Sequence, residues 1–258
     1  MSSAQPPAYP EGKKLLDGRT VLVTAAAGTG IGFATAQRCA EEGARLVVSD
    51  AHARRLGETA ETLGDAVVAA VPCDVTEEDQ VQRLFAEAEA ATGGLDVVVN
   101  NAGLGGQVEV VDMTDEQWTK VLDVTLNGTF RCMRAALRLM TARGAGAIVN
   151  NASVLGWRAQ AGQAHYAAAK AGVMALTRCA AIEAAPSGVR VNAVAPSIAM
   201  HPFLAKASSE ELLTELTARE AFGRAAEPWE VANVIVFLAS DYSSYMTGEV
   251  LSVSSQHP

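Results

Sequence analysis

A glycine turn between a strand and a helix constrains the fold of this chain more than any other feature. Residues 19–24 (RTVLVT) form a β-branched run typical of a buried strand, and residues 28–32 read GTGIG. An Ala-rich helical pattern follows and ends at Gly43, a residue favoured after a helix C-terminus. Glycines at such a turn let backbone N–H groups approach a phosphate, although an ordinary tight turn has the same composition.

Strand and helix patterns then alternate along the chain. Further strands are predicted at residues 45–50, 66–74, 95–103, 147–153, 190–196 and 249–254. Helices are predicted at residues 52–63, 76–92, 115–142, 163–185 and from residue 227. Short connections between alternating strands and helices predict a parallel sheet wound by right-handed crossovers. The expected fold is α/β, a Rossmann-type doubly wound parallel sheet in three αβα layers.

One domain is expected to contain the whole ordered chain. Residues 15–258 are predicted to form it, because an α/β sheet protein of this length is commonly a single unit. Residues 1–14 are rich in Pro and polar side chains, which predicts a flexible arm. Residues 197–224 contain a polar, helix-forming insert where a short connection is expected, and such inserts are often lids over a site.

Charge and cysteine content argue against several classes of protein. The net charge is −9 and the basic residues are scattered, so no nucleic-acid partner is expected. Cys39, Cys73, Cys132 and Cys179 lie in apolar runs without C-x-x-C spacing, which predicts buried free thiols in a reducing compartment and no metal site. No signal core precedes the domain and no apolar run approaches the ~20 residues that span a bilayer, so we expect a cytoplasmic protein without membrane contact.

Tyr166 and Lys170 carry the strongest catalytic signal. If the residues after Gly162 are helical, the two side chains lie one turn apart on one face. A free phenol has a pKa near 10, and a neighbouring cation is expected to stabilise its phenolate. Ser153, at the end of the preceding strand, could hold a substrate oxygen against that phenol, which suits proton transfer to a carbonyl or alcohol oxygen. Taken alone, the pair also fits a surface contact on an Ala-rich packing helix.

Polar residues at two other strand ends favour a dinucleotide site. Asp50 ends the strand about twenty residues after the glycine turn, where an acid accepts hydrogen bonds from adenosine ribose hydroxyls. Because an acid there repels a 2′-phosphate, NAD is expected over NADP, although Arg54 and Arg55 leave NADP open. Residues 100–103 (NNAG) end another strand at the same sheet edge, where they either line the site or cap a turn.

Taken in order, these motifs resemble the short-chain dehydrogenase/reductase family over residues 17–253. The resemblance implies a dinucleotide-binding and catalytic domain that transfers a hydride between a secondary alcohol and a ketone. Tyr166 would be the acid/base, Lys170 would hold the nicotinamide ribose and favour the phenolate, and Ser153 would orient the substrate oxygen. The family's cofactor contacts correspond here to Gly28, Gly30, Ile31, Gly32, Asp50, Asp74, Val75, Asn101, Ala102, Gly103, Tyr166, Lys170, Pro196 and Ala199. A homotetramer through the helices at 115–142 and 163–185 is also implied.

The chain departs from the family pattern in three places. Ala25 or Ala26 stands where the family has its first glycine. Thr125 occupies the position of the family's fourth catalytic residue, an Asn. The Pro-Gly turn reads Pro196-Ser197, and His201 stands where a Thr often contacts the cofactor. These departures bear on the proton relay and on the cofactor clamp.

Three runs of sequence suggest a substrate class. NNASVLGWRAQ, HYAAAKAGVMALTRC and AFGRAAEPWEVA resemble bacterial reductases of steroid ring catabolism that act on bicyclic acyl-CoA compounds. The alternative is a 3-oxoacyl-thioester reductase, and an alternative of another class is a non-catalytic dinucleotide-binding sensor or scaffold. His165 precedes Tyr166 and faces about 100° away from it, so it is expected behind the site or at an interface.

Overall fold

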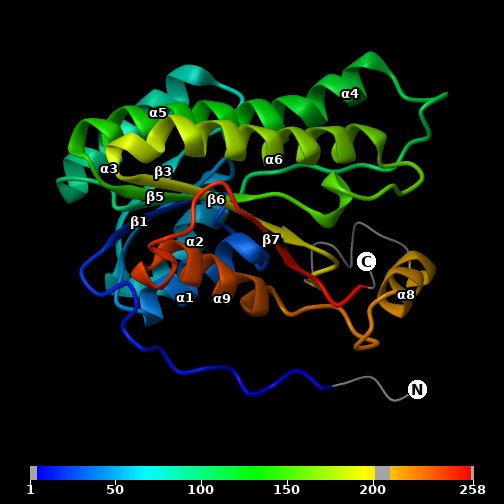
Figure 1. The fold of residues 1–258 in the computed structure, drawn as a ribbon, viewed down its shortest axis with the longest axis horizontal. Coiled ribbons are helices and arrows are strands. Elements are labelled where there is room, and N and C mark those ends of the chain that lie inside the picture. Colours follow the sequence, from blue (N-terminus) through cyan, green and yellow to red (C-terminus); the bar gives the residue numbers. More distant parts are fainter. Residues whose placement is uncertain (1–4, 201–209, 257–258) are drawn as a thin grey trace.

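The computed structural model describes residues 5–200 and 210–256, and within them seven parallel strands form one sheet in the order β3-β2-β1-β4-β5-β6-β7 (Figure 1). The strands are β1 (Thr20–Thr24), β2 (Arg45–Asp50), β3 (Val67–Pro72), β4 (Val97–Asn100), β5 (Gly146–Asn151), β6 (Val189–Pro196) and β7 (Val250–Val253). The order reverses direction between β1 and β4, as in a doubly wound sheet. The predicted fold class is confirmed.

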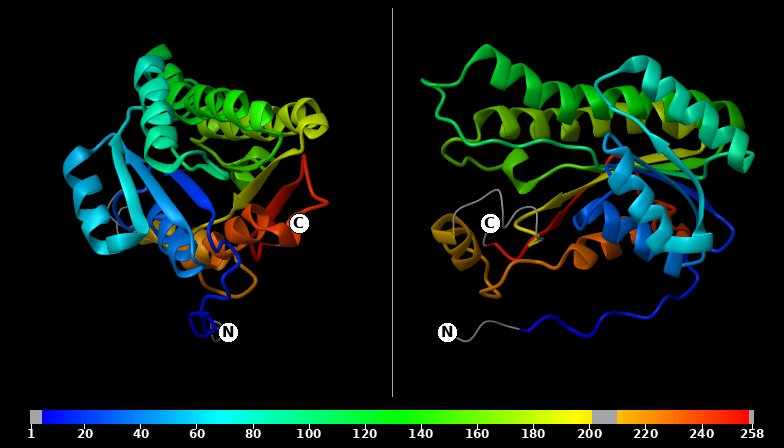
Figure 2. Two further views of the ribbon diagram at one scale, coloured as in Figure 1. Left: turned by 90° about the vertical axis from the view of Figure 1, so that its left-hand side faces the viewer. Right: turned by 180° about the vertical axis from the view of Figure 1, so that it is seen from behind.

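Helices cover both faces of the sheet (Figures 1 and 2). One face carries α3 (Glu78–Thr92), α5 (Gly128–Arg143) and α6 (Ala164–Ala184). The other face carries α1 (Ile31–Glu41), α2 (Ala53–Leu63) and α9 (Pro228–Ala239). Strand residues alternate between the two cores, with Leu22 packed on the first and Val23 on the second. Burial on both faces explains why the strands are continuously apolar rather than alternating with polar residues.

The predicted strand at residues 95–103 is shorter in the structure. β4 ends at Asn100 because the N–H of Asn101 turns to the Thr24 hydroxyl, 3.0 Å away, instead of continuing the ladder. The hydroxyl also accepts from the N–H of Ala102 at 3.3 Å. The chain therefore leaves the sheet at its carboxyl edge, where ligands of such sheets bind.

The long helix predicted at residues 115–142 is interrupted by a π turn. α4 (Asp115–Leu122) begins with a capping box at Thr114, a π turn follows at Asp123–Asn127, and α5 continues from there. Single π turns inside helices insert an extra residue and frequently occur at functional sites. Thr125 lies within this turn.

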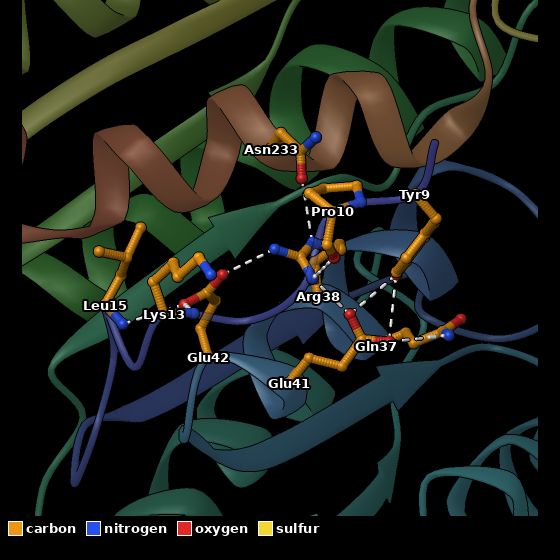
Figure 3. Close-up of polar contacts among 9 residues, drawn as sticks. All are labelled: Tyr9, Pro10, Lys13, Leu15, Gln37, Arg38, Glu41, Glu42 and Asn233. Carbon is orange, nitrogen blue, oxygen red and sulfur yellow. Dashed lines mark hydrogen bonds and ion pairs between the residues drawn. The ribbon is translucent and has the colours of Figure 1, made fainter. Parts of the chain in front are cut away.

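The N-terminal arm lies against α1 and α9 (Figure 3). The Tyr9 hydroxyl donates to Glu41 at 2.9 Å, and the Tyr9 ring meets the Trp229 ring edge-on with centroids 5.3 Å apart. Glu42 accepts from the N–H groups of Lys13 and Leu15, at 2.7 and 3.0 Å. The sequence predicted a flexible arm for residues 1–14. The described part is held by polar and aromatic contacts, and its mobility stays a prediction.

One of the four cysteines differs from expectation. Cys39, Cys73 and Cys132 are buried, whereas Cys179 is exposed on α6. Ile182, three residues further along the same helix, is 77% exposed. Apolar residues on α6 therefore extend beyond the face that packs on the sheet, so an apolar neighbourhood in sequence did not imply burial for Cys179.

We find no helix among the described residues with the length and apolar character needed to cross a membrane. 

Candidate active site

The ends of β4 and β5 form the floor of the site. The Asn101 amide donates to the carbonyl groups of Thr24 and Ala25 at 3.3 and 3.1 Å, and its oxygen accepts from Asn151 at 2.8 Å. These bonds join the turns that follow β1, β4 and β5. The Asn101 side chain, predicted as a cofactor contact, is thus bonded on both its amide nitrogen and its oxygen to neighbouring parts of the chain.

Ser153, Tyr166 and Lys170 converge above this floor. Ser153 follows β5 and is 8% exposed, while Tyr166 and Lys170 come from the first two turns of α6. The Ser153 hydroxyl accepts from the N–H of Leu155 at 3.2 Å, and it is close enough to the Tyr166 phenol to act on its pKa. The Lys170 ammonium lies 5.5 Å from the centroid of the Tyr166 ring. The helix thus brings together the residues that the sequence singled out, and a phenol between a hydroxyl and an ammonium suits proton transfer to a ketone oxygen.

The protonation of this trio differs from the sequence-based expectation. Burial raises the pKa of Tyr166 above its ordinary value, and the hydrogen bond from Ser153 only partly opposes this. Burial also lowers the pKa of Lys170 to about 8. The Lys170 ammonium donates to the carbonyl of Asn151. The expected lowering of the phenol pKa by Lys170 is absent from the protein alone, because desolvation of the phenol outweighs it.

The glycine turn fits a dinucleotide phosphate. Gly28 has φ of +96°, and among the described residues nothing lies within 4 Å of the Cβ that a larger residue would add there. Gly30 caps α1 and has no side chain to satisfy the free N–H groups of the first helical turn. A Cβ on Gly32 would stand 2.1 Å from the Ala25 carbonyl oxygen, so only glycine allows this approach of helix to strand. Open space and free N–H groups at a helix start are what a pyrophosphate needs.

Ala25 replaces a glycine at a cost in backbone strain. Its φ is +49°, in the left-handed region that residues with a Cβ rarely adopt. The family's first glycine in this turn is thus replaced by an alanine that keeps a glycine-like conformation. The effect of this alanine on cofactor binding stays a prediction.

Asp50 stands beside the glycine turn at the end of β2. Its carboxylate accepts from the N–H of Ala27 at 3.2 Å and from the N–H of His52 at 2.9 Å. Burial raises the pKa of Asp50, and the hydrogen bond from Ala27 and the charge of Arg55 act in the opposite direction. Asp74, the next predicted contact, accepts from the N–H and hydroxyl of Thr76 at 2.9 and 2.8 Å. Both acids are fixed by local bonds at the carboxyl edge of the sheet.

The remaining predicted contacts lie along the same edge. Val75 and Ala199 are buried, and Ala199 pairs with Ala226 in an isolated bridge just beyond β6, which ends at Pro196. His201 lies outside the described residues. The roles given to these residues in binding a cofactor stay predictions.

Thr125 is fully buried and holds a loop. Its hydroxyl accepts from the N–H of Leu104 at 3.0 Å and donates to the carbonyl of the same residue at 3.1 Å. The π turn brings this hydroxyl to the chain that follows β4. Membership of Thr125 in a proton relay stays a prediction, whereas its contact with Leu104 makes it a positioning residue.

Sequence reasoning missed the contribution of residues 104–107. A Cβ on Gly103 would lie 3.3 Å from the Lys170 nitrogen, and one on Gly105 would lie 3.7 Å from the Tyr166 ring. The loop therefore runs directly beside the catalytic side chains. The signal was present as a GLGG run at residues 103–106.

A cavity opens beyond this loop. It has a volume of about 230 Å³ and is lined by Gln107, Ala159, Gln160, Ala161, Glu215, Leu216 and Arg219. Glu215 and Arg219 belong to or follow α8 (Glu210–Ala218), in the segment that the sequence predicted as a lid. None of Ser153, Tyr166 and Lys170 lines this cavity, and Gln107 is the residue that connects it in sequence to the glycine loop.

Comparisons with known proteins agree with this geometry. Residues 25–255 match the family model described as "Enoyl-(Acyl carrier protein) reductase". The chain is 66% identical, over 96% of both chains, to a (5R,7aS)-5-hydroxy-7a-methyl-1-oxo-2,3,5,6,7,7a-hexahydro-1H-indene-carboxyl-CoA reductase of Mycobacterium tuberculosis. It is 45% identical to a cis-4-hydroxycyclohexanecarboxylate dehydrogenase of Sinomonas cyclohexanicum, over 91% of this chain and 94% of that one. A crystal structure of a short chain dehydrogenase from Mycobacterium smegmatis superposes with a TM-score of 0.87 at 59% identity, covering 98% of this chain and 99% of the other.

A doubly wound sheet with a glycine turn and a Ser–Tyr–Lys trio defines an oxidoreductase that acts on CH–OH groups with NAD or NADP. The chain belongs to the short-chain dehydrogenase/reductase family.

Proposed function

We propose that this enzyme interconverts a ketone and a secondary alcohol on a bicyclic, steroid-derived acyl-CoA, with NAD(H) as the preferred cofactor. The observation that carries the proposal is the convergence of Ser153, Tyr166 and Lys170 in a chain 66% identical to a reductase of such a compound. That identity extends over 96% of both chains, so it is not confined to the nucleotide-binding half.

The chain's own residues handle the substrate oxygen and its proton. The Ser153 hydroxyl is close enough to the Tyr166 phenol to lower its pKa, so a carbonyl oxygen bound beside them would meet two hydroxyl groups. The raised pKa keeps the Tyr166 phenol protonated at neutral pH, which suits it as the acid when a ketone is reduced. The glycine turn and Asp50 would hold a nicotinamide dinucleotide, which would supply the hydride for reduction of the ketone. Lys170 places its positive charge beside the phenol and stabilises the phenolate left after proton donation.

The preference for NAD follows from Asp50. Its carboxylate is fixed beside the glycine turn by the N–H groups of Ala27 and His52. A carboxylate in this place accepts from ribose hydroxyls and repels a 2′-phosphate. Arg54 is exposed on α2 and pairs with Glu58 at 3.2 Å, whereas Arg55 is close enough to Asp50 for its charge to lower the Asp50 pKa and is the residue that could favour a 2′-phosphate.

A 3-oxoacyl-thioester reductase is the second candidate. It is favoured by the family model, whose description names an acyl-carrier-protein substrate. Both substrates are thioesters of a long pantetheine arm and differ in the acyl part. The choice between them therefore depends on the cavity beside Gln107 and Gln160 and not on the catalytic trio.

A panel of substrates tests the proposal. The purified enzyme is given NADH or NADPH with the bicyclic ketone-bearing acyl-CoA, a 3-oxoacyl-CoA, a 3-oxoacyl carrier protein and 4-oxocyclohexanecarboxylate. We expect kcat/KM for the bicyclic thioester to exceed that of each other substrate by at least about ten-fold, a difference of about 1.4 kcal/mol in transition-state binding. A higher kcat/KM for either 3-oxoacyl compound would establish the second candidate instead.

Tyr166→Phe tests whether the Tyr166 phenol transfers the proton. It removes the hydroxyl that transfers the proton, so turnover should fall by roughly a hundred-fold or more while the cofactor still binds. Tyr245→Phe is the matched control, since Tyr245 is fully exposed and should retain wild-type turnover. Full activity of Tyr166→Phe would refute the catalytic assignment. Cofactor binding by the wild type without turnover of any of these compounds would favour a sensor or scaffold.

The proposal also includes an oligomeric state and a cellular compartment. We infer a homotetramer from apolar side chains on the outer faces of α5 and α6, where Phe130 is 41% and Ile182 is 77% exposed. Free cysteines support a reducing compartment such as the cytoplasm. Light scattering on the purified protein measures the assembly, and a monomer at micromolar concentration would contradict it.

A further inference from the structure

His165 is a buried histidine that the proposed reaction does not use. It immediately precedes Tyr166 and is 1% exposed. α6 begins at Ala164, so His165 and Tyr166 belong to its first turn, where backbone N–H groups have no partner within the helix. Within the described part of the chain, the side chain of Gln163 at the cap position makes no capping bond. The start of the catalytic helix therefore depends on another acceptor.

His165 provides that acceptor. Its Nδ1 accepts a hydrogen bond from the N–H of Tyr166 at 2.9 Å. An imidazole nitrogen accepts through its lone pair, so this bond uses the Nδ1 atom as an acceptor and leaves Nε2 on the other edge of the ring. The cap is thus made by the side chain next to the catalytic tyrosine, on the backbone group of the tyrosine itself.

The opposite edge of the ring contacts the loop after β4. A Cβ added to Gly106 would lie 3.0 Å from Nε2 of His165, a distance that leaves no room for a larger residue without movement. A Cβ added to Gly103 would lie 3.3 Å from the Lys170 nitrogen, and one added to Gly105 would lie 3.7 Å from the Tyr166 ring. Successive glycines of the loop therefore pass Lys170, Tyr166 and His165 in order.

Two further contacts fix this loop. Thr125 holds Leu104 by both its N–H and its carbonyl, at 3.0 and 3.1 Å. The N–H of Val108 donates to the carbonyl of Gly162 at 3.0 Å, just before α6. Between these points the loop passes the first turns of α6, where His165 lies beside Gly106.

We propose that His165 is a positioning residue that sets the place of the Tyr166 phenol. Its Nδ1 caps the first turn of α6 at Tyr166, and its Nε2 edge seats the glycine loop against the same turn. Loss of the acceptor frees the Tyr166 N–H and loosens the turn that aims the phenol. Displacements of about 1 Å in a reacting group can lower a rate roughly a hundred-fold. The kinetic consequence rests on the proposed function, whereas the cap itself does not.

A pair of variants separates the cap from packing. His165→Asn keeps an oxygen acceptor at the place of Nδ1 but removes most of the ring. His165→Phe keeps the ring volume but has no acceptor. If the cap positions Tyr166, His165→Asn should retain kcat within about three-fold, and His165→Phe should lose about ten-fold or more. The dissociation constant for the cofactor should stay within about two-fold in both, since α1 and Asp50 are unaltered.

Hydrogen exchange at the Tyr166 amide gives a readout that needs no substrate. Exchange should stay slow in the wild type and in His165→Asn, and become at least about ten-fold faster in His165→Phe. If His165→Phe does not fold, His165→Ala replaces it, because Ala leaves a cavity like that of Asn but lacks the acceptor. The proposal would be overturned if His165→Asn had the same kcat and the same protection of the Tyr166 amide as His165→Phe, or as His165→Ala where that variant replaces it. If the wild type turns over none of the substrates, the proposed function fails and the exchange rates still decide on the cap.

Discussion

The Arg38 guanidinium and the Glu42 carboxylate form an ion pair that is almost entirely buried. Their nitrogen and oxygen lie 2.6 Å apart, with 4% and 2% of the side chains exposed. The same guanidinium donates to Asn233 of α9 at 3.0 Å. Figure 3 shows the arm, α1 and α9 meeting at this pair. It lies near the C-terminal end of α1, the helix whose other end follows the glycine turn.

The first prediction concerns Glu42→Gln. The change removes one of the two carboxylates that pair with Arg38, leaves the pair with Glu41, and weakens the bonds to the N–H groups of Lys13 and Leu15. Leaving a buried charge with no partner costs about 3–5 kcal/mol, and because Glu41 remains we expect a smaller fall, about 1–3 kcal/mol, in the free energy of unfolding. Urea denaturation measures it. Glu58→Gln is the control, since it breaks an exposed pair with Arg54 at the same spacing and should cost less than about 0.5 kcal/mol.

A second prediction concerns Thr125→Val. The change preserves shape but removes both hydrogen bonds to Leu104. Two partly buried backbone groups then lose their partner, which should cost about 1 kcal/mol of stability. Because the loop also contacts Tyr166 and Lys170, kcat should fall as well. Thr125→Ser retains the hydroxyl, so its stability and its kcat should both stay close to those of the wild type. A Val variant with wild-type kcat and melting temperature would show that the loop is held by other contacts.

The cofactor preference gives a third prediction, tested with Asp50→Ser. Removing the carboxylate relieves repulsion of a 2′-phosphate, so the ratio of NADPH to NADH affinity should rise by at least about ten-fold, or about 1.4 kcal/mol. NADH itself should bind less tightly. Nicotinamide fluorescence titrations give both dissociation constants. Asp65→Ser, at an exposed acid after α2, should leave the ratio unchanged. Tighter binding of NADPH than NADH by the wild type would refute the role assigned to Asp50.

The depressed pKa of Lys170 leads to a fourth prediction. Burial lowers this pKa from 10.5 to about 8 in the folded protein without cofactor. The unfolded chain holds the proton more tightly, so the charged lysine costs stability at neutral pH, and this cost disappears as the pH rises through about 8 to 10.5. Lys170→Met should therefore raise the free energy of unfolding at pH 7 by up to about 3 kcal/mol. That gain should be nearly lost near pH 10.5.

Urea denaturation of both proteins at several pH values measures this difference. Tyr166 is present in both, so its own titration largely cancels. Lys120→Met, at an exposed lysine of α4, should change stability by less than about 0.5 kcal/mol throughout. A gain that is independent of pH would mean that Met acts through packing and not through charge.

Most of the fold could be predicted from local pattern. β2 spans the same residues in prediction and structure, and α2, α6 and β6 differ by a single residue at one or both ends. Each of these elements has a strong period and a clear stop signal. The predicted bounds were wrong where a side chain replaces a backbone acceptor. The N–H of Asn101 donates to the Thr24 hydroxyl, so β4 ends earlier than predicted. The π turn at Asp123–Asn127 was not predicted either, because its residues are equally compatible with an uninterrupted α-helix.

For the site, spacing predicted that Tyr166 and Lys170 lie together, since residues four apart on a helix share a face. The direction of the Tyr166 pKa shift was wrong, because it depends on burial by segments distant in sequence. The exposure of Cys179 was missed for the same reason, since it depends on which face of α6 the sheet covers.

By itself, then, the sequence determined the order of strands and helices and singled out Ser153, Tyr166 and Lys170 as candidate catalytic residues, because element order and the four-residue spacing on a helix are local features. Only the tertiary structure decided how those residues are protonated and positioned. The cap by His165, the clamp of Leu104 by Thr125 and the buried Arg38–Glu42 pair each join groups whose roles are set by packing. Desolvation and hydrogen-bond geometry arise from the folded environment, and no local pattern encodes them.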